Sequence, residues 1–97
     1  MDERIGMVAY SKAGRDKGRL FVVVKIIDEK SLMLADGDLR RIEKPKVKNI
    51  KHVKITNIVA ENIKPILIAG EMPDNHLIRK NLKELQKSEV RDGKEVW

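Results

Sequence analysis

The chain has 97 residues and a mass of 11.1 kDa, which is enough for one small domain with a short appendage and too little for two independent cores. Hydrophobic residues make up 41% of the sequence and charged residues 37%, a balance typical of a globular protein and not of a disordered or fibrous one. The absence of cysteine excludes disulfides, thiolate zinc sites and cysteine nucleophiles, and it favours a reducing compartment, so we expect a cytoplasmic protein.

Neither a membrane span nor a secretion signal is predicted. No apolar run approaches the roughly 18 residues that a bilayer crossing needs. The N-terminal Met-Asp-Glu-Arg also lacks the basic and then apolar pattern of a signal peptide.

Positive charge is concentrated in the first half of the chain. The formal net charge is +6, and residues 1–55 hold 14 lysines and arginines against 8 acidic residues, whereas residues 56–97 hold 7 of each. This asymmetry predicts a module of residues 1–55 that faces a polyanion and a neutral appendage of residues 56–97. An anionic membrane surface is the competing partner, but the basic half contains no basic amphipathic helix that could lie on it.

Short apolar runs separated by turn residues predict five strands in the first half. They cover residues 5–11, 20–27, 31–35, 39–42 and 52–55. Residues 28–30 and the pair Asp36-Gly37 supply turns that favour a three-stranded antiparallel meander. Pro45 confines residues 43–49 to a loop or a sheet edge. Because five short strands can hide their edges by curling up, we expect a mainly β fold, a small barrel followed by two short helices.

Helical spacing replaces the strand pattern beyond residue 55. Apolar residues in 57–69 recur at roughly helical spacing and Gly70 follows as a C-terminal cap, which predicts a first helix that Pro65 kinks or splits. Asp74 caps a second predicted helix that runs to about Lys87, and the residues after it, which end in Trp97, are expected to fray. The second helix carries one apolar stripe: Leu77, Ile78, Leu82 and Leu85. Packing on the barrel or on the preceding helix is the simpler interpretation of this stripe, and a homodimer contact is the alternative.

A basic loop with two glycines joins the first two predicted strands. Gly14 and Gly18 permit φ values above zero that a side chain would penalise by roughly 1–2 kcal/mol, so the loop can turn sharply. We expect its cations to project outward toward an anion, and a purely structural turn is the alternative. These cations are Lys12, Arg15, Lys17 and Arg19.

Residues 6–23 resemble a KOW motif, in which a strand, a basic loop with a fixed glycine, a lysine-glycine pair and a second strand follow one another. Gly14 matches the glycine and Lys17-Gly18 matches the pair. Together with residues 35–37 and 45–53, the stretch 4–55 resembles bacterial KOW-domain RNA-binding proteins, which are similar to large-subunit ribosomal proteins of the "L-fourteen-e" type; residues 78–82 add a weaker likeness. The resemblance implies an SH3-like barrel that binds ribosomal RNA on the ribosome without catalysis. Pro65 departs from the continuous helix expected there.

A second basic cluster lies between residues 40 and 54. Its seven cations are Arg40, Arg41, Lys44, Lys46, Lys48, Lys51 and Lys54. On a closed barrel this cluster could extend the positive face of the Gly14 loop, and Asn49 and His52 could add hydrogen bonds to phosphate, ribose or a base edge. A solvated edge that discourages aggregation is the alternative.

The predicted RNA-binding residues are therefore Lys12, Gly14, Arg15, Lys17, Gly18, Arg19, Arg40, Arg41, Lys44, Lys46, Lys48, Asn49, Lys51 and His52. The only aromatic residues are Tyr10, Phe21 and Trp97, and Phe21 is expected in the core. Since binders of unpaired strands normally stack successive bases on aromatic platforms, structured RNA is the favoured ligand.

The sequence offers no catalytic or metal-binding constellation. His52 and His76 are the only histidines, and without cysteine they make no plausible metal site. The glycine loop lacks the Gly-Lys-Ser/Thr ending of a P-loop because Arg19 follows Gly18, and no base is placed beside Ser11. We therefore predict a non-enzymatic protein without cofactor or metal. The alternative function is a protein-interaction module of the transcription or translation machinery.

Overall fold

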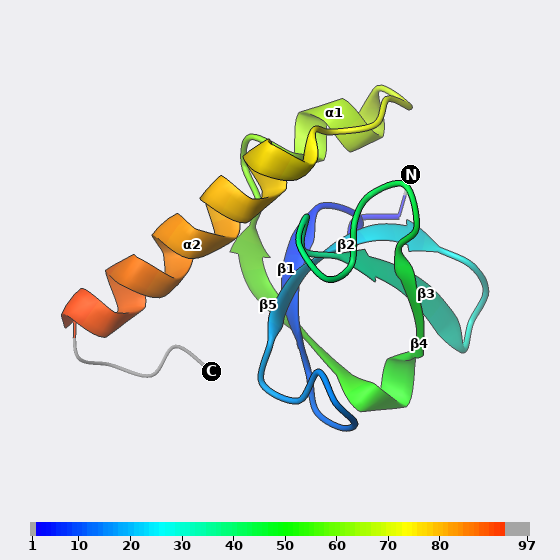
Figure 1. Cartoon of the computed structure of the whole chain (residues 1–97). Coiled ribbons are helices and arrows are strands. Elements are labelled where there is room, and N and C mark those ends of the chain that lie inside the picture. Colours follow the sequence, from blue (N-terminus) through cyan, green and yellow to red (C-terminus); the bar gives the residue numbers. More distant parts are fainter. Residues whose placement is uncertain (1, 93–97) are drawn as a thin grey trace.

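Five strands form one antiparallel sheet that two helices follow, in a computed structural model that describes residues 2–92 (Figure 1). The strands are β1 (Met7–Ser11), β2 (Leu20–Ile26), β3 (Ser31–Ala35), β4 (Lys46–Asn49) and β5 (Val53–Val59), and a 3-10 turn, η1 (Ile50–His52), joins β4 to β5. The strand order is β4-β3-β2-β1-β5. Because β5 returns to pair with β1, the two edges of the strongly curved sheet are β4 and β5.

The predicted three-stranded meander of β1, β2 and β3 is confirmed. Val22 lies opposite Val8 on one side and opposite Ala35 on the other. In the hairpin after β2, the carboxylate of Asp28 accepts a hydrogen bond of 2.8 Å from the backbone N–H of Lys30. The glycine of the predicted Asp-Gly turn, Gly37, has a φ of 76°. Both turns therefore lie where local turn chemistry predicted them.

The predicted strand over residues 39–42 is wrong, because that stretch belongs to a loop and the fourth strand is β4, directly after Pro45. The side chain of Asp36 replaces a strand ladder in the loop: its Oδ1 accepts hydrogen bonds from the backbone N–H groups of Asp38 at 3.0 Å and Arg40 at 2.8 Å. Such local side-chain bonds compete with sheet formation. β4 is an edge strand, and Pro45 predicted either a loop or a sheet edge for residues 43–49.

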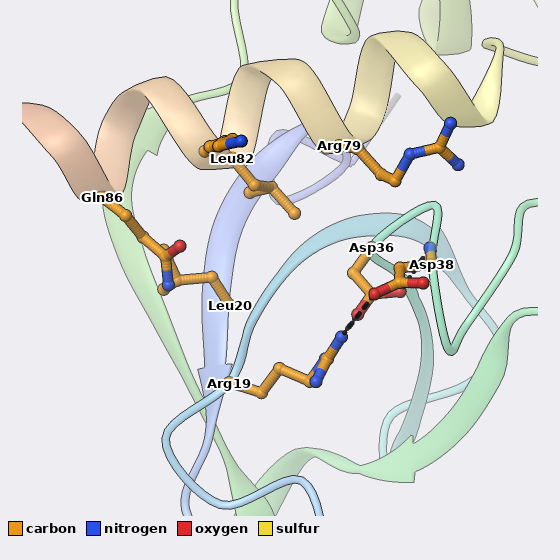
Figure 2. A pocket seen from close by; sticks show the side chains of 8 residues that line it. Arg19, Leu20, Asp36, Asp38, Arg79, Leu82 and Gln86 are labelled. Atoms are coloured by element: carbon orange, nitrogen blue, oxygen red, sulfur yellow. Dashed lines mark hydrogen bonds and ion pairs between the residues drawn. The ribbon is translucent and has the colours of Figure 1, made fainter.

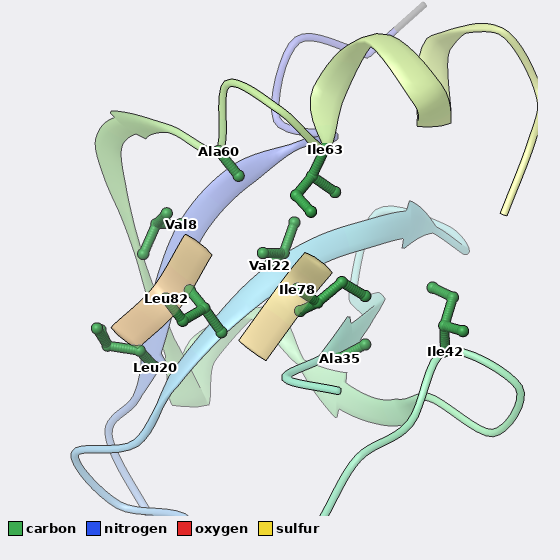
Figure 3. Packing of buried hydrophobic residues seen from close by; sticks show 9 residues of the cluster. All are labelled: Val8, Leu20, Val22, Ala35, Ile42, Ala60, Ile63, Ile78 and Leu82. Carbon is green, nitrogen blue, oxygen red and sulfur yellow. The ribbon is translucent and has the colours of Figure 1, made fainter. Parts of the chain in front are cut away.

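The curvature of the sheet buries apolar side chains on both of its faces. The inner cluster contains Ala9, Phe21, Val23, Leu32, Leu34 and Val53. The outer cluster, drawn in Figure 3, contains Val8, Leu20, Val22, Ala35, Ile42, Ala60, Ile63, Ile78 and Leu82. Strand β2 contributes alternate residues to the two clusters, which explains why it begins with a continuous apolar run instead of an apolar and polar alternation.

The predicted helix over residues 57–69 is wrong in its first half. Strand β5 continues to Val59, which pairs with Met7, and helix α1 covers only Lys64–Ile68. Pro65 stands in the first turn of α1, where its missing N–H breaks no helical bond, so it begins the helix and does not kink it. The predicted cap at Gly70 is confirmed: its φ is 79°, and its N–H donates to the carbonyl of Leu67 at 3.0 Å.

Helix α2 spans Asn75–Asp92 and begins where the sequence predicted. The carboxylate of Asp74 accepts a hydrogen bond of 2.7 Å from the backbone N–H of His76, as an N-terminal cap should. Ile78 and Leu82 of the apolar stripe are buried in the outer cluster, so the stripe packs on the sheet, and a homodimer through this helix stays a prediction.

The C-terminal part of α2 is helical where fraying was expected. Residues 88–92 are still helical, and residues 93–97 with Trp97 lie outside the described part. Within residues 2–92, no helix combines the length and the apolar character that a bilayer crossing requires.

Candidate nucleic-acid interface

The loop between β1 and β2 turns on two glycines with positive φ. Gly14 has a φ of 80° and Gly18 a φ of 83°, values that favour glycine and agree with the expected sharp turn. The N–H of Gly18 donates to the carbonyl of Ser11 at 2.8 Å and closes the loop. The loop therefore holds a defined shape. Its exposed cations are Lys12, Arg15 and Lys17.

Residues of both basic clusters line one hollow of about 290 Å³. One wall comes from the Gly14 loop and the other from Arg40, β4 and η1, segments that are far apart in the sequence. The hollow is lined by Gly14, Arg15, Asp16, Arg40, Lys46, Val47, Lys48, Asn49 and His52. Seven of the fourteen predicted RNA-binding residues thus face one space, and we call it the basic hollow.

Lys48 fastens the Gly14 loop to β4 at the basic hollow. Its ammonium donates hydrogen bonds to the hydroxyl of Ser11 at 2.6 Å and to the carbonyl of Ala13 at 2.9 Å. Two of its three donors are therefore used within the protein. Its charge still contributes to the potential in the hollow, but its main contacts are structural.

An acidic side chain, Asp16, lies in the wall of the basic hollow. Asp16 is only 6% exposed, and its carboxylate accepts a hydrogen bond of 3.0 Å from the guanidinium of Arg40. The ion pair joins the Gly14 loop to the loop before β4 and orients Arg40. Sequence reasoning missed this role, although a single acid within a run of four cations was a usable signal.

The guanidinium of Arg19 pairs with two acidic side chains of the protein instead of projecting freely as predicted, although the side chain is 36% exposed. Its guanidinium donates to the carboxylates of Asp36 at 2.5 Å and Asp38 at 3.2 Å (Figure 2). The hydrogen bond with Asp36 raises the pKa of Arg19 above its ordinary value. Arg19 lines a different hollow, of about 380 Å³, together with Arg79 and Leu82 of α2.

Helix α2 holds the loop that precedes β4. The side-chain oxygen of Asn75 accepts a hydrogen bond of 2.8 Å from the backbone N–H of Ile42, and its amide nitrogen donates to the carboxylate of Glu43 at 2.7 Å. This second bond lowers the pKa of Glu43 below its ordinary value. Arg79 donates to the carbonyl of Gly37 at 2.5 Å. The helix thereby positions three candidate ligands: Arg40, Arg41 and Lys44.

A larger hollow of about 530 Å³ adjoins the basic hollow. Its lining consists of Leu39, Arg40, Arg41, Lys44, Pro45, Lys46 and Val47. The two hollows share Arg40, Lys46 and Val47, so they form one continuous surface. Five predicted residues line neither of them: Lys12, Lys17, Gly18, Arg19 and Lys51.

Among residues 2–92, no group of three or more histidine and acidic side chains is placed to hold a metal ion. His52 lines the basic hollow, whereas His76 lies in the first turn of α2.

No family model matches the chain, and no curated protein matches it. The resemblance of residues 4–55 to KOW domains stays a prediction that rests on the motif residues named above.

Proposed function

We propose that this protein is a non-enzymatic, cytoplasmic RNA-binding protein that grips folded RNA, in particular ribosomal RNA of the large subunit. The basic hollow is the observation that carries the proposal, because two basic segments distant in sequence line one space there. Lysine and arginine side chains on a shared surface attract the phosphates of an RNA backbone. Asn49 and His52 can add directional hydrogen bonds to phosphate or to the ribose 2′-hydroxyl.

The proposal includes an SH3-like barrel of the KOW type. The strand order, in which β5 returns to β1 after the 3-10 turn η1, supports it. A link across the sheet supports it further: Lys48 of the edge strand β4 binds Ser11 at the end of β1, which lies three strands away in the sheet order.

The distribution of aromatic side chains favours structured RNA over unpaired strands. Phe21 is fully buried in the inner cluster, and neither Phe21 nor Tyr10 lines the basic hollow. Among the described residues, the lining of the basic hollow has no phenylalanine, tyrosine or tryptophan, and His52 is its one aromatic ring. A cationic surface with so little aromatic area is suited to recognising backbone and shape.

The salt dependence of binding tests the proposal. Six phosphate contacts give a log-log salt slope of about −4 to −5. We expect the double variant Arg15→Gln with Lys46→Gln to weaken the binding of large-subunit ribosomal RNA and to make the slope about two units shallower. The measurement is fluorescence anisotropy with labelled RNA fragments at several salt concentrations.

A charge-matched control variant distinguishes RNA binding at the two hollows from nonspecific electrostatic attraction of RNA to the whole surface. Lys25→Gln with Lys80→Gln removes two exposed cations that line neither hollow, and we expect it to bind RNA like the unaltered protein. Equal weakening by both double variants, or no binding of ribosomal RNA at low salt, contradicts the proposal.

An apolar groove favours the second candidate function, a protein-interaction module of the transcription or translation machinery. The groove lies where β5 is followed by α1, and it includes the exposed side chains of Val59 and Ile68. If the protein is such a module, a ribosomal or RNA polymerase protein should still co-purify with it after nuclease treatment. This co-purification should depend weakly on salt and should be lost in the variant Ile68→Asp.

A further inference from the structure

Strand β4 turns its lysines toward the inner core and its valine toward solvent. Lys48 lies opposite Leu32, which is fully buried, whereas Val47 lies opposite Met33 on the other face and is 50% exposed. A shift of one residue in the register would bury Val47. The bond from Lys48 to the hydroxyl of Ser11 favours the observed register, so the exposure of Val47 is built into the fold.

Leu39 is likewise held at the surface, by the loop that precedes β4. Its side chain is 64% exposed. The residues on either side of it, Asp38 and Arg40, both donate their backbone N–H groups to the carboxylate of Asp36. The backbone therefore cannot turn Leu39 inward without breaking hydrogen bonds to a buried acid.

These two exposed side chains face one space. Leu39, Pro45 and Val47 line the 530 Å³ hollow, and we call these three residues the apolar shelf. All other described residues that line this hollow are cations: Arg40, Arg41, Lys44 and Lys46. Two of them have an acidic partner outside this lining, because Arg40 pairs with Asp16 and Arg41 lies 3.8 Å from the carboxylate of Glu43. Because Val47 also lines the basic hollow, the shelf is continuous with the surface proposed for the RNA backbone.

We propose that the apolar shelf receives the base of one unpaired nucleotide that projects from RNA held in the basic hollow. A base has two apolar faces that gain free energy on leaving water, and the phosphate attached to it carries a negative charge. A nucleotide therefore matches a small apolar surface whose lining carries four cations and no acid among the described residues. The shelf has three side chains, which suits one base and not a run of stacked bases.

This inference rests on the proposed RNA-binding function and specifies the kind of RNA. It predicts a preference for a helix with a bulged or loop nucleotide over an uninterrupted duplex. Since the contact is apolar, it adds affinity without adding a phosphate contact, and the salt slope should not change.

Two RNA hairpins that differ by a single bulged nucleotide provide the test. The bulged position carries 2-aminopurine, whose fluorescence reports on its surroundings, and affinity is measured by anisotropy with the full chain. We expect the bulged hairpin to bind about fivefold more tightly. The shelf variant Leu39→Ser should abolish this preference while leaving the affinity for the duplex hairpin and both salt slopes unchanged.

The control removes an equally accessible apolar side chain elsewhere. Met72→Ser alters an exposed residue of the segment after α1, and the preference for the bulge should persist. Circular dichroism checks that the variants fold, and Leu39→Thr serves if Leu39→Ser does not.

Each outcome separates this inference from the proposed function. Equal affinity for both hairpins, or equal weakening of both by the shelf variant, overturns the inference and leaves RNA binding intact. Failure to bind either hairpin overturns both proposals. An acidic amphipathic peptide that displaces the bulged hairpin, and that itself binds less tightly to the shelf variant, would assign the shelf to a protein partner instead.

Discussion

The ammonium group of Lys48 joins the edge strand β4 to the loop that follows β1. Its bonds to Ser11 and Ala13 connect segments more than thirty residues apart in the sequence. A charged side chain that points inward from an edge strand also discourages pairing with another chain. The alternative interpretation of the second basic cluster, edge protection, therefore fits Lys48, while the exposed Arg15 and Lys44 are better suited to binding an external anion.

We expect Lys48→Met to lower the free energy of unfolding by about 1–3 kcal/mol, because it removes charge-assisted hydrogen bonds to a buried hydroxyl and a carbonyl. Urea denaturation followed by circular dichroism measures the change. The matched control is Lys44→Met, an exposed lysine nearby, which should alter stability by no more than about 0.5 kcal/mol. Equal effects of the two substitutions would show that the Lys48 bonds contribute nothing to the fold.

At the scale of elements, the first two turns of α2 support the loop that precedes β4. Asn75 and Arg79 bind the backbone of this loop at Ile42 and Gly37. The helix also approaches Gly37 so closely that a Cβ there would overlap the carbonyl oxygen of Asn75. The position of the loop cations thus depends on a helix that carries no part of the KOW-like motif of the first strands.

Alanine substitutions at Gly18 and Gly37 test this close approach, because both glycines have a positive φ but only Gly37 has atoms packed against it. Gly18 has a φ of 83° and open space around it, so Gly18→Ala should lower the free energy of unfolding by about 1–2 kcal/mol from backbone strain alone. Gly37→Ala adds the overlap with Asn75, and we expect it to cost at least about 1 kcal/mol more. Urea denaturation compares the two variants, and equal losses would contradict the tight packing.

At the scale of the whole molecule, the outer cluster joins the sheet to the helices that follow it. Val8 and Val22 of the sheet pack in the same cluster as Ile63 and Ile78 from the later part of the chain. Without the helices, this face of the sheet would expose a contiguous apolar surface to water. The basic surface and α2 are therefore expected to unfold as one cooperative unit.

Ile78→Ala tests this cooperativity. The side chain is fully buried, so its truncation should lower the free energy of unfolding by about 2–5 kcal/mol. Circular dichroism at the helix band and NMR signals of β2 amides should report the same urea midpoint in both the unaltered protein and the variant. A helix that melts before the sheet would refute a single unit, and Leu39→Ala, at an exposed position, supplies the control that should leave the midpoint unchanged.

The amino-acid sequence alone predicted the features that depend on a few neighbouring residues. The turns at Gly14, Gly18 and Gly37 lie where expected because a positive φ is a property of the single residue. The caps at Asp74 and Gly70 were predictable for the same reason, since each acts on backbone groups within the adjacent turn.

Only the tertiary structure decided which segments became β4 and β5 and which cations stayed free. Residues 39–42 have a strand-like composition, but the carboxylate of Asp36 holds them in a loop. Arg19 and Lys48 looked like surface ligands, yet each found a partner distant in the sequence, Asp36 and Ser11. Local pattern carries no information about such pairings, because the energy of an ion pair or a hydrogen bond depends on distances that arise only when the chain has folded.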